Sequence, residues 1–296
     1  MTAPGESDRS VRDALMRADR ECRRAERAAE FAERHEQQAF TDPPRLREFH
    51  LRLAVMLRRV ETQHVAAAKM HTSHAVRLRS WIDSADGHRS MPRLMASVAE
   101  AAGADGAAIT LFGPGLAECV TAVSDNTAKA AQDAEFTLGE GPARDAMRRH
   151  CAVRATGTGL FRRWPNYGPA VARLGIRSIA AIPIDPAGVP LGTLTLFGPR
   201  SPTTIDNGLR TIADTVATML LSEDATFITG DAAPTSCLLA EADHRAIIHQ
   251  ASGIVSVACG CSIPDALALI RARAFADDRP IESVASDIVA RTVRLP

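Results

Sequence analysis

The stretch VACGCSIPDALALIR, residues 257–271, holds the corner that decides the C-terminal fold. Gly260 follows an apolar helical pattern, at a place where a left-handed residue ends a helix with little strain. Ser262 is positioned to cap the next helix, with Asp265 three residues later and Pro264 in the first turn. The stretch therefore predicts a glycine-terminated helix followed at once by a serine-capped helix.

A metal knuckle at Cys259 and Cys261 is the alternative interpretation of the same letters. A tetrahedral zinc site needs four ligands, and the spare candidates Cys237, His244 and His249 lack the spacing of a zinc finger. We therefore interpret the two cysteines as small apolar residues beside the corner, and we expect no metal and no cofactor.

A third helical pattern follows the corner and begins after Pro280. Its apolar residues recur at i, i+3, i+4, i+7 and i+8, which places them on one face of a helix. Short helices of this kind bury their stripes only against one another. The sequence therefore predicts a three-helix bundle over residues 238–296.

The middle of the chain shows a mixed pattern of helices and strands. Strand-like runs cover 107–112, 119–124, 178–184 and 191–197, and residues 151–153 begin another. Helical patterns cover 94–102, 145–150, 169–174 and 205–221. We predict an α+β fold with one antiparallel sheet over residues 90–222, followed by a polar linker at 223–237.

The N-terminal residues 1–86 are predicted to be a helical hairpin or a dimerising coiled coil. Prolines 43 and 44 separate two long helical patterns, at about 7–40 and 45–82. In the first pattern, small and apolar residues follow a heptad repeat: Val11, Leu15, Ala18, Cys22, Ala25, Ala29 and Ala32.

Histidines interrupt the stripe of the second helix. His50, His64 and His71 share one heptad position, and His74 lies beside them. A charged imidazole in a seam would oppose helix association, which suggests a switch that responds to pH or metal. The alternative is a set of neutral side chains that form hydrogen bonds at the edge of the seam.

Composition excludes several classes of protein. The 296 residues carry 35 basic and 35 acidic side chains, so no overall charge attracts nucleic acid or an anionic membrane. The first residues lack the pattern of a secretory signal, and no apolar run is long enough to span a bilayer. We expect a cytoplasmic protein with reduced cysteines and no membrane partner.

Three segments of the middle region resemble the GAF domain: LGEGPARDAMRRH (138–150), RRWPNYGPAVARLGIRSIAAIPI (162–184) and GVPLGTLTLFGPRS (188–201). The resemblance covers about residues 90–222. It implies a six-stranded antiparallel sheet with a small-molecule pocket on one face and dimerising helices on the other. Many relatives have a cysteine after the GEGP motif, where this chain has Ala143.

Candidate ligand contacts lie between the GEGP turn and the strand at 178–184. An aromatic residue in a loop rich in proline and glycine can line a pocket, although ordinary core packing is the alternative for each one. The candidates are Phe136, Phe161, Trp164, Tyr167 and Arg177.

Three further segments resemble the ANTAR domain: HRAIIHQASGIV (244–255), PDALALIRARAF (264–275) and DRPIESVASDIVAR (278–291). ANTAR domains bind RNA as antiterminators. With a GAF domain upstream, the resemblance implies a transcription antitermination regulator of the actinobacterial type. It also implies a homodimer whose bundles recognise tandem hairpins in a leader transcript.

The candidate RNA contacts lie on the predicted bundle. Residues 238–296 hold six arginines and seven acidic residues, so RNA affinity would require a focused basic patch. Many family members have lysine at the position of Ser252 and an aromatic residue at that of Leu267. The candidates are Arg245, His249, Ser252, Arg271, Arg273 and Arg279.

Two other functions are weighed against RNA binding. One is a sensor and protein-interaction module that has lost RNA binding, which would suit Ser252 and the near-neutral bundle. The other is a thiol-dependent enzyme on the sheet, for which Cys119 and Cys151 are the candidates. Neither cysteine has an identifiable base beside it, so we expect no enzymatic activity.

Overall fold

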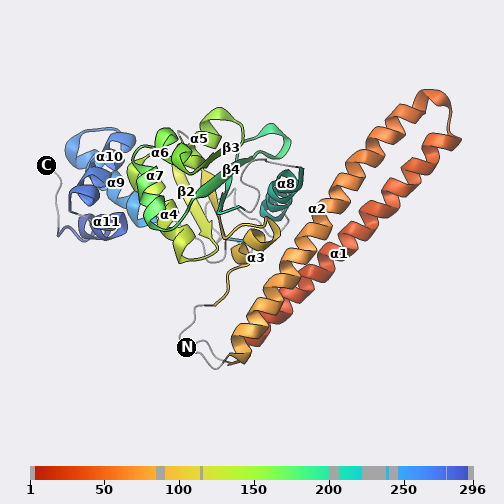
Figure 1. The fold of residues 1–296 in the computed structure, drawn as a ribbon, viewed down its shortest axis with the longest axis horizontal. Coiled ribbons are helices and arrows are strands. Elements are labelled where there is room, and N and C mark those ends of the chain that lie inside the picture. The colour runs from red at the N-terminus through yellow and green to blue at the C-terminus, as the bar shows by residue number, and fades with distance from the viewer. Residues whose placement is uncertain are drawn as a thin grey trace.

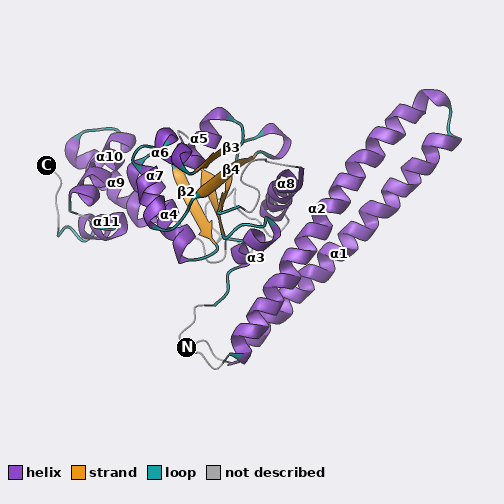
Figure 2. Cartoon of the chain, in the orientation of Figure 1, coloured by secondary structure: helices purple, strands orange, loops and turns teal. Residues whose placement is uncertain are grey.

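The computed structural model describes residues 4–84, 91–113, 116–199, 207–221, 238–239, 246–277 and 279–292. It contains a long helical hairpin, a five-stranded antiparallel sheet with helices on both faces, and a C-terminal bundle of three helices (Figures 1 and 2). The predicted mixed fold with these three parts is confirmed. The predicted linker at 223–237 lies outside the described residues.

The hairpin pairs α1 (Pro4–Thr41) with α2 (Pro44–Asp83) along most of their length. The chain turns at Asp42 and Pro43, as the two prolines predict. Because 38 and 40 residues form these helices, the hairpin extends well beyond the sheet (Figure 1).

Two of the seven predicted seam residues on α1, Leu15 and Cys22, do not lie in the seam. Leu15 is 49% exposed and Cys22 is exposed, whereas Ala14 and Glu21 are buried against α2. At Cys22 a polar pair that the apolar pattern does not reveal takes the predicted place: His64 Nδ1 on α2 lies 2.6 Å from Glu21 Oε2. The seam therefore runs through Glu21, and the apolar residues beside it lie on the flank of the hairpin.

The sheet has the strand order β2-β1-β5-β4-β3, and all neighbours are antiparallel. Its strands are β1 (Gly106–Phe112), β2 (Glu118–Val123), β3 (Val153–Thr156), β4 (Ser178–Ile184) and β5 (Gly192–Phe197). The short helix η2 (Pro186–Gly188) turns the chain between β4 and β5. The GAF resemblance implies six strands, and the described residues form five.

Helices cover both faces of the sheet. On one face, α3 (Leu94–Ala101) and α8 (Asn207–Leu221) pack between the sheet and α2, and Ala67 and Met70 of α2 join their apolar core. On the other face lie α4 (Asn126–Leu138) and α5 (Pro142–Arg149), with α6 (Thr158–Arg163) and α7 (Tyr167–Arg173) beside them. The hairpin thus covers the helices that the GAF resemblance assigns to dimerisation.

Helix α4 was not predicted, and it proves central to the site. Asp125 caps it, since Asp125 Oδ1 accepts a hydrogen bond from the Ala128 amide at 2.9 Å. Gly139 ends it with a left-handed φ of 68°. Its buried face mixes alanine with Gln132 and Glu135, so a hydrophobic period is missing from the sequence.

The C-terminal bundle consists of α9 (Ala246–Cys259), α10 (Ile263–Ala276) and α11 (Ile281–Val289). The corner has the predicted form: Gly260 has a φ of 63°, and Ser262 Oγ accepts a hydrogen bond from the Asp265 amide at 3.3 Å. Cys259 and Cys261 are partly buried against the core of the bundle. The interpretation of this stretch as a helix corner is confirmed.

The bundle docks on the sheet region through α10, which packs against α4. Phe136 of α4 is fully buried and belongs to the same apolar cluster as the core of the bundle.

In the described part of the chain, no single helix is long and apolar enough to cross a membrane. Helices α9 and α10 together reach that length and hydropathy, but the pair is bent by 106°.

Candidate functional site

A buried polar cluster lies between the sheet and helices α4, α5 and α7. Glu118 begins β2, Glu135 is on α4, and Arg144 is on α5; all three side chains are buried. Arg144 Nη2 forms an ion pair with Glu118 Oε1 at 2.8 Å, and the Arg144 amide donates to Glu135 Oε1 at 2.9 Å. The cluster therefore joins the edge strand β2 to both helices.

The GEGP motif makes room for this cluster. A Cβ atom at Gly141 would lie 2.5 Å from Glu135 Cδ, far closer than real Cβ atoms approach. Glycine is therefore required at this position because the Glu135 carboxyl group fills the space beside it.

Burial determines the protonation of the cluster. Burial, and then the nearby negative charge of Glu118, raise the pKa of Glu135 to about 8, against the backbone amide and side chain of Arg144, which favour the carboxylate. Burial, with the same two carboxyl groups, also raises the pKa of Tyr167 well above its ordinary value. At neutral pH Glu135 is therefore mostly protonated and Tyr167 is neutral.

Hydrogen-bonding groups face this cluster from the sheet as well. Thr110 lies opposite Thr121 on β2 and opposite Thr193 on β5, which gives a row of hydroxyl groups across three strands. Several buried polar atoms of the cluster have no hydrogen-bond partner among the described residues: Thr121 Oγ1, Gln132 Nε2, Glu135 Oε2, Trp164 Nε1, Tyr167 OH, Thr193 Oγ1 and Thr195 Oγ1. Buried donors and acceptors in folded proteins are usually paired with protein groups or with ordered water, so this cluster is an unusual concentration of unpaired polar atoms.

The structure brings together only two of the five predicted ligand contacts. Trp164 and Tyr167 are buried and meet edge to face, with ring centroids 6.0 Å apart. Phe161 is 43% exposed on α6, and Arg177 is exposed beside β4. Phe136 is directed into the bundle rather than toward Trp164 and Tyr167.

The charged members of this cluster were not predicted from the sequence. Glu118, Glu135 and Arg144 are polar letters that look like solvent-exposed residues, and they are far apart in the sequence. The available signals were the glutamate at the start of an otherwise apolar strand and the small residues of the GEGP turn.

The predicted RNA contacts on the bundle have different environments. Ser252 is 1% exposed, and its Oγ donates to the His249 carbonyl at 2.8 Å, so this side chain is not presented to a partner. Arg273 and Arg279 are exposed and paired with Asp277 at 2.6 Å and Asp287 at 2.7 Å.

Two of the predicted RNA contacts face the sheet region instead of solvent. His249 Nε2 lies 3.1 Å from the Glu118 carbonyl oxygen, and Arg271 Cζ lies 4.7 Å from the centroid of the Phe136 ring. Arg245 lies outside the described residues. The bundle therefore has both exposed and docked basic side chains.

The sequence of these three helices matches a known domain family. Residues 238–289 match the ANTAR domain. The match spans all three helices of the bundle and supports a regulator that contains an ANTAR domain, a class that binds RNA in transcription antitermination. Such regulators are generally not enzymes. No curated protein matches the chain in a sequence comparison.

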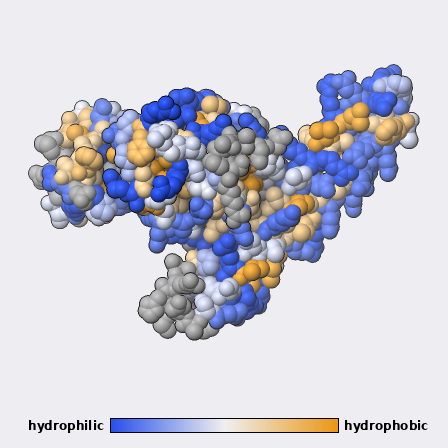
Figure 3. Space-filling view, in the orientation of Figure 1, coloured by the Kyte–Doolittle hydropathy of each residue, from blue (hydrophilic) through white to orange (hydrophobic). Residues whose placement is uncertain are grey.

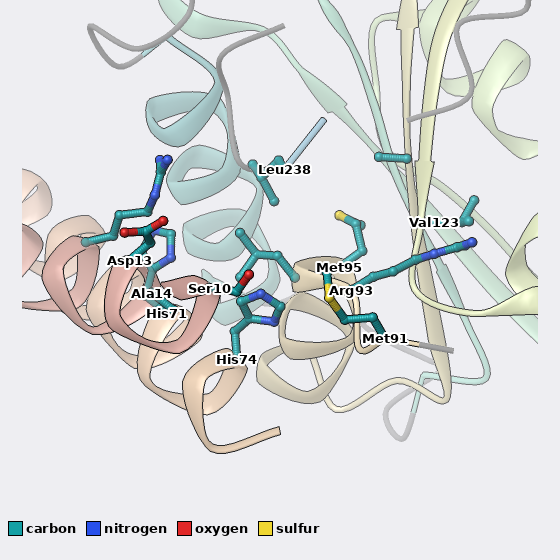
Figure 4. Close-up of a pocket in the computed structure, with 13 residues that line it drawn as sticks. Ser10, Asp13, Ala14, His71, His74, Met91, Arg93, Met95, Val123 and Leu238 are labelled. Carbon is teal, nitrogen blue, oxygen red and sulfur yellow. The ribbon is translucent and has the colours of Figure 1, made fainter. Parts of the chain in front are cut away.

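A cavity of about 170 Å³ separates the hairpin from the sheet region and reaches Leu238, the first residue of the ANTAR match (Figure 4). Ser10, Asp13, Arg17, His71 and His74 line it from the hairpin side. Met91, Arg93, Leu94, Met95, Ala122 and Val123 line it from the other side.

The hairpin histidines fall into two groups. His64 pairs with Glu21, and His50 Nε2 lies 3.0 Å from Asp42 Oδ2. Burial, assisted by neighbouring arginines, lowers the pKa values of His71 and His74 to about 4. Both imidazoles at the cavity are therefore neutral at physiological pH. Among the described residues, no group of three or more His, Cys, Asp or Glu side chains could hold a metal ion.

Proposed function

We propose that this protein is a ligand-responsive RNA-binding regulator of transcription antitermination. The observation that carries the proposal is the ANTAR match on a bundle of three helices in the expected order. In this proposal the bundle binds paired hairpins of a leader transcript, and the sheet region acts as a GAF-type sensor.

Arginine contacts with phosphate would supply the RNA affinity. Arg271, Arg273 and Arg279 lie on or beside α10 and can form bidentate contacts with phosphate groups once their present partners are replaced. Exchanging an exposed carboxylate partner for a phosphate costs little, because exposed ion pairs contribute little to stability. RNA binding is therefore compatible with a bundle of near-neutral charge.

Replacing Arg271 and Arg273 together with alanine is expected to weaken RNA binding about tenfold and to reduce the salt slope by about one for each phosphate contact removed. The measurement is fluorescence anisotropy with a tandem-hairpin RNA over a series of salt concentrations. The matched control is Arg148→Ala with Arg149→Ala, two exposed arginines on α5. If both double variants have the same salt slope as the wild type, α10 does not contact RNA.

A protein-interaction module is the second candidate function. It is favoured by the exposed apolar side chains of the bundle, above all Val257 at 86% and Phe275 at 73% exposure. It is also favoured by the ion pairs that Arg273 and Arg279 form with Asp277 and Asp287. In such a module, replacing Arg271 and Arg273 would not change the salt dependence of RNA binding.

The sensor role rests on the buried polar cluster. Its neutral donors, its Thr110 row and the Glu118–Arg144 ion pair favour a small ligand with several hydrogen-bonding groups. Such a ligand would satisfy buried polar atoms, each of which costs about 1–3 kcal/mol when left unpaired. Ligand binding then favours whichever arrangement of the bundle it binds more tightly.

We further propose that the hairpin forms a homodimer. Two adjoining hollows on the flank of the hairpin share Val76. Their lining includes Leu15, Cys22, Val65, Ala68, Thr72 and Ala75, together with the charged residues Lys69, Arg77, Arg79, Asp83 and Glu100. Leu15 and Cys22 are seven residues apart, as are Val65 and Thr72, so the groove has the heptad period of a helix partner. Figure 3 shows further hydrophobic side chains on the hairpin, where a second copy would cover them.

Leu15→Lys is expected to shift the protein from dimer to monomer, because a buried ammonium group would oppose packing of a second hairpin. Sedimentation velocity gives the mass in solution. Met16→Lys is the matched control, since Met16 is 60% exposed and lies outside the residues that line the groove. Equal masses for the two variants would contradict this interface.

A further inference from the structure

Two side chains of the ANTAR bundle hold it against the sheet region. The guanidinium group of Arg271 stacks on the Phe136 ring at 4.7 Å. A carbonyl oxygen only accepts hydrogen bonds, so His249 must donate from Nε2 to the Glu118 carbonyl at 3.1 Å. Both residues are among the RNA contacts predicted from the sequence, and the proposed function uses Arg271.

We infer that RNA and the sheet region compete for the same face of the bundle, an inference that rests on the proposed RNA-binding function. Docked on Phe136, the guanidinium group of Arg271 is directed toward α4 and cannot reach a phosphate of a transcript. The fully buried Phe136 ring also packs with the core of the bundle, so undocking exposes apolar surface as well. RNA binding through Arg271 therefore requires the bundle to leave α4.

The docking contacts connect directly to the buried polar cluster. Phe136 follows Glu135, whose carboxyl group accepts from the Arg144 amide. Glu118 contacts His249 through its backbone carbonyl and Arg144 through its carboxylate. A change in the arrangement of Glu118, Arg144 and Glu135 would therefore move Glu118 and Phe136, the two residues that the bundle contacts. A ligand bound at Glu118 or Glu135 would therefore contact a residue that either touches the bundle itself or precedes one that does.

The C-terminal end of α4 offers a substitution that should tighten the docking. Gly139 has a left-handed φ of 68°, and a Cβ atom there would lie 3.8 Å from Arg271 Nη1. Aspartate and asparagine tolerate this backbone conformation better than most residues. Gly139→Asp therefore places a carboxylate beside the guanidinium group, whereas Gly139→Asn adds a neutral side chain of the same size.

Two variants should change RNA affinity in opposite directions. Gly139→Asp is expected to lower affinity for a tandem-hairpin RNA about fivefold relative to Gly139→Asn, and Phe136→Leu is expected to raise it by a similar factor. Gly188→Asp is the control for charge and backbone: its φ is 79°, nothing lies near its Cβ position, and it sits in the β4–β5 turn. Its affinity should stay within about twofold of the wild type.

Hydrogen exchange of the full chain without RNA provides a second measurement. Peptides of α4 and α10 should exchange faster in Phe136→Leu and more slowly in Gly139→Asp, while those of the α1–α2 hairpin stay unchanged. Altered exchange with unaltered RNA affinity in both variants would overturn the competition and leave the proposed function intact. Altered exchange with no RNA binding by any variant, including the wild type, would overturn the proposed function itself.

Discussion

The free energy of unfolding is expected to fall by about 3 kcal/mol between pH 5 and pH 7.5 through Glu135 alone. The folded protein holds this carboxyl group with a pKa of about 8, against 4.5 as its ordinary value. Between these two values the folded state binds more protons than the unfolded state, so stability decreases as the pH rises. Above pH 8 the cost of the buried charge is fully present.

Glu135→Gln should remove this dependence. The amide group has the shape of the protonated carboxyl group and can still accept a hydrogen bond from the Arg144 amide. Urea unfolding at several pH values gives the difference between variant and wild type, which should grow in favour of the variant as the pH rises. Glu30→Gln, at an exposed position on α1, is the control. A constant difference across this range would mean that Glu135 is ionised in the folded protein.

Acid should weaken the junction between the hairpin and the sheet region. The pKa values of His71 and His74 are lowered to about 4 by burial first, and then by the charges of Arg17 on His71 and of Arg77 on His74; Glu21 opposes the shift at His71. The unfolded state therefore binds more protons between pH 4 and 6.5, and stability is lost as the pH falls through this window. From pH 7 to pH 5 the loss is about 2 kcal/mol for His71 and somewhat less for the more exposed His74.

Replacing both His71 and His74 with asparagine should make the loss of stability between pH 7 and pH 5 smaller than in the wild type. The charges around the cavity in Figure 4 explain the direction: a protonated imidazole would join Arg17 and Arg93, with Asp13 at the cavity and Glu21 near His71 as the opposing carboxylates. Urea unfolding at pH 5 and pH 7 measures the effect, and His150→Asn at an exposed position controls for loss of a histidine. If the double variant lost as much stability between pH 7 and pH 5 as the wild type, groups other than His71 and His74 would cause the loss.

Local chemistry made the C-terminal bundle predictable from the sequence. Gly260, Ser262 and Asp265 set the corner within a few residues, and three apolar stripes can be buried only against one another. The sheet was equally predictable from the sequence, since its strands are apolar and bounded by turn residues. Each of these features depends on neighbours in the sequence.

The candidate site was harder to predict from the sequence, because pairs of residues far apart in the chain determine it. Glu21, paired with His64 43 residues later in the chain, lies in the hairpin seam where Cys22 was expected. Arg144 reaches Glu118, and Phe136 was assigned to ligand binding although it packs into a bundle that begins at residue 246. Periodicity reports which face of a helix is apolar, and it does not report which distant residue that face will meet.

RNA binding by the full-length chain is the measurement that tests this account most directly. We expect a tandem-hairpin leader RNA to bind at least about tenfold more tightly than a scrambled RNA of the same length at moderate salt, with affinity falling as salt rises. Equal affinity for the two RNAs would contradict specific recognition by the ANTAR bundle, and the exposed apolar surface around Val257 and Phe275 would then favour a protein partner.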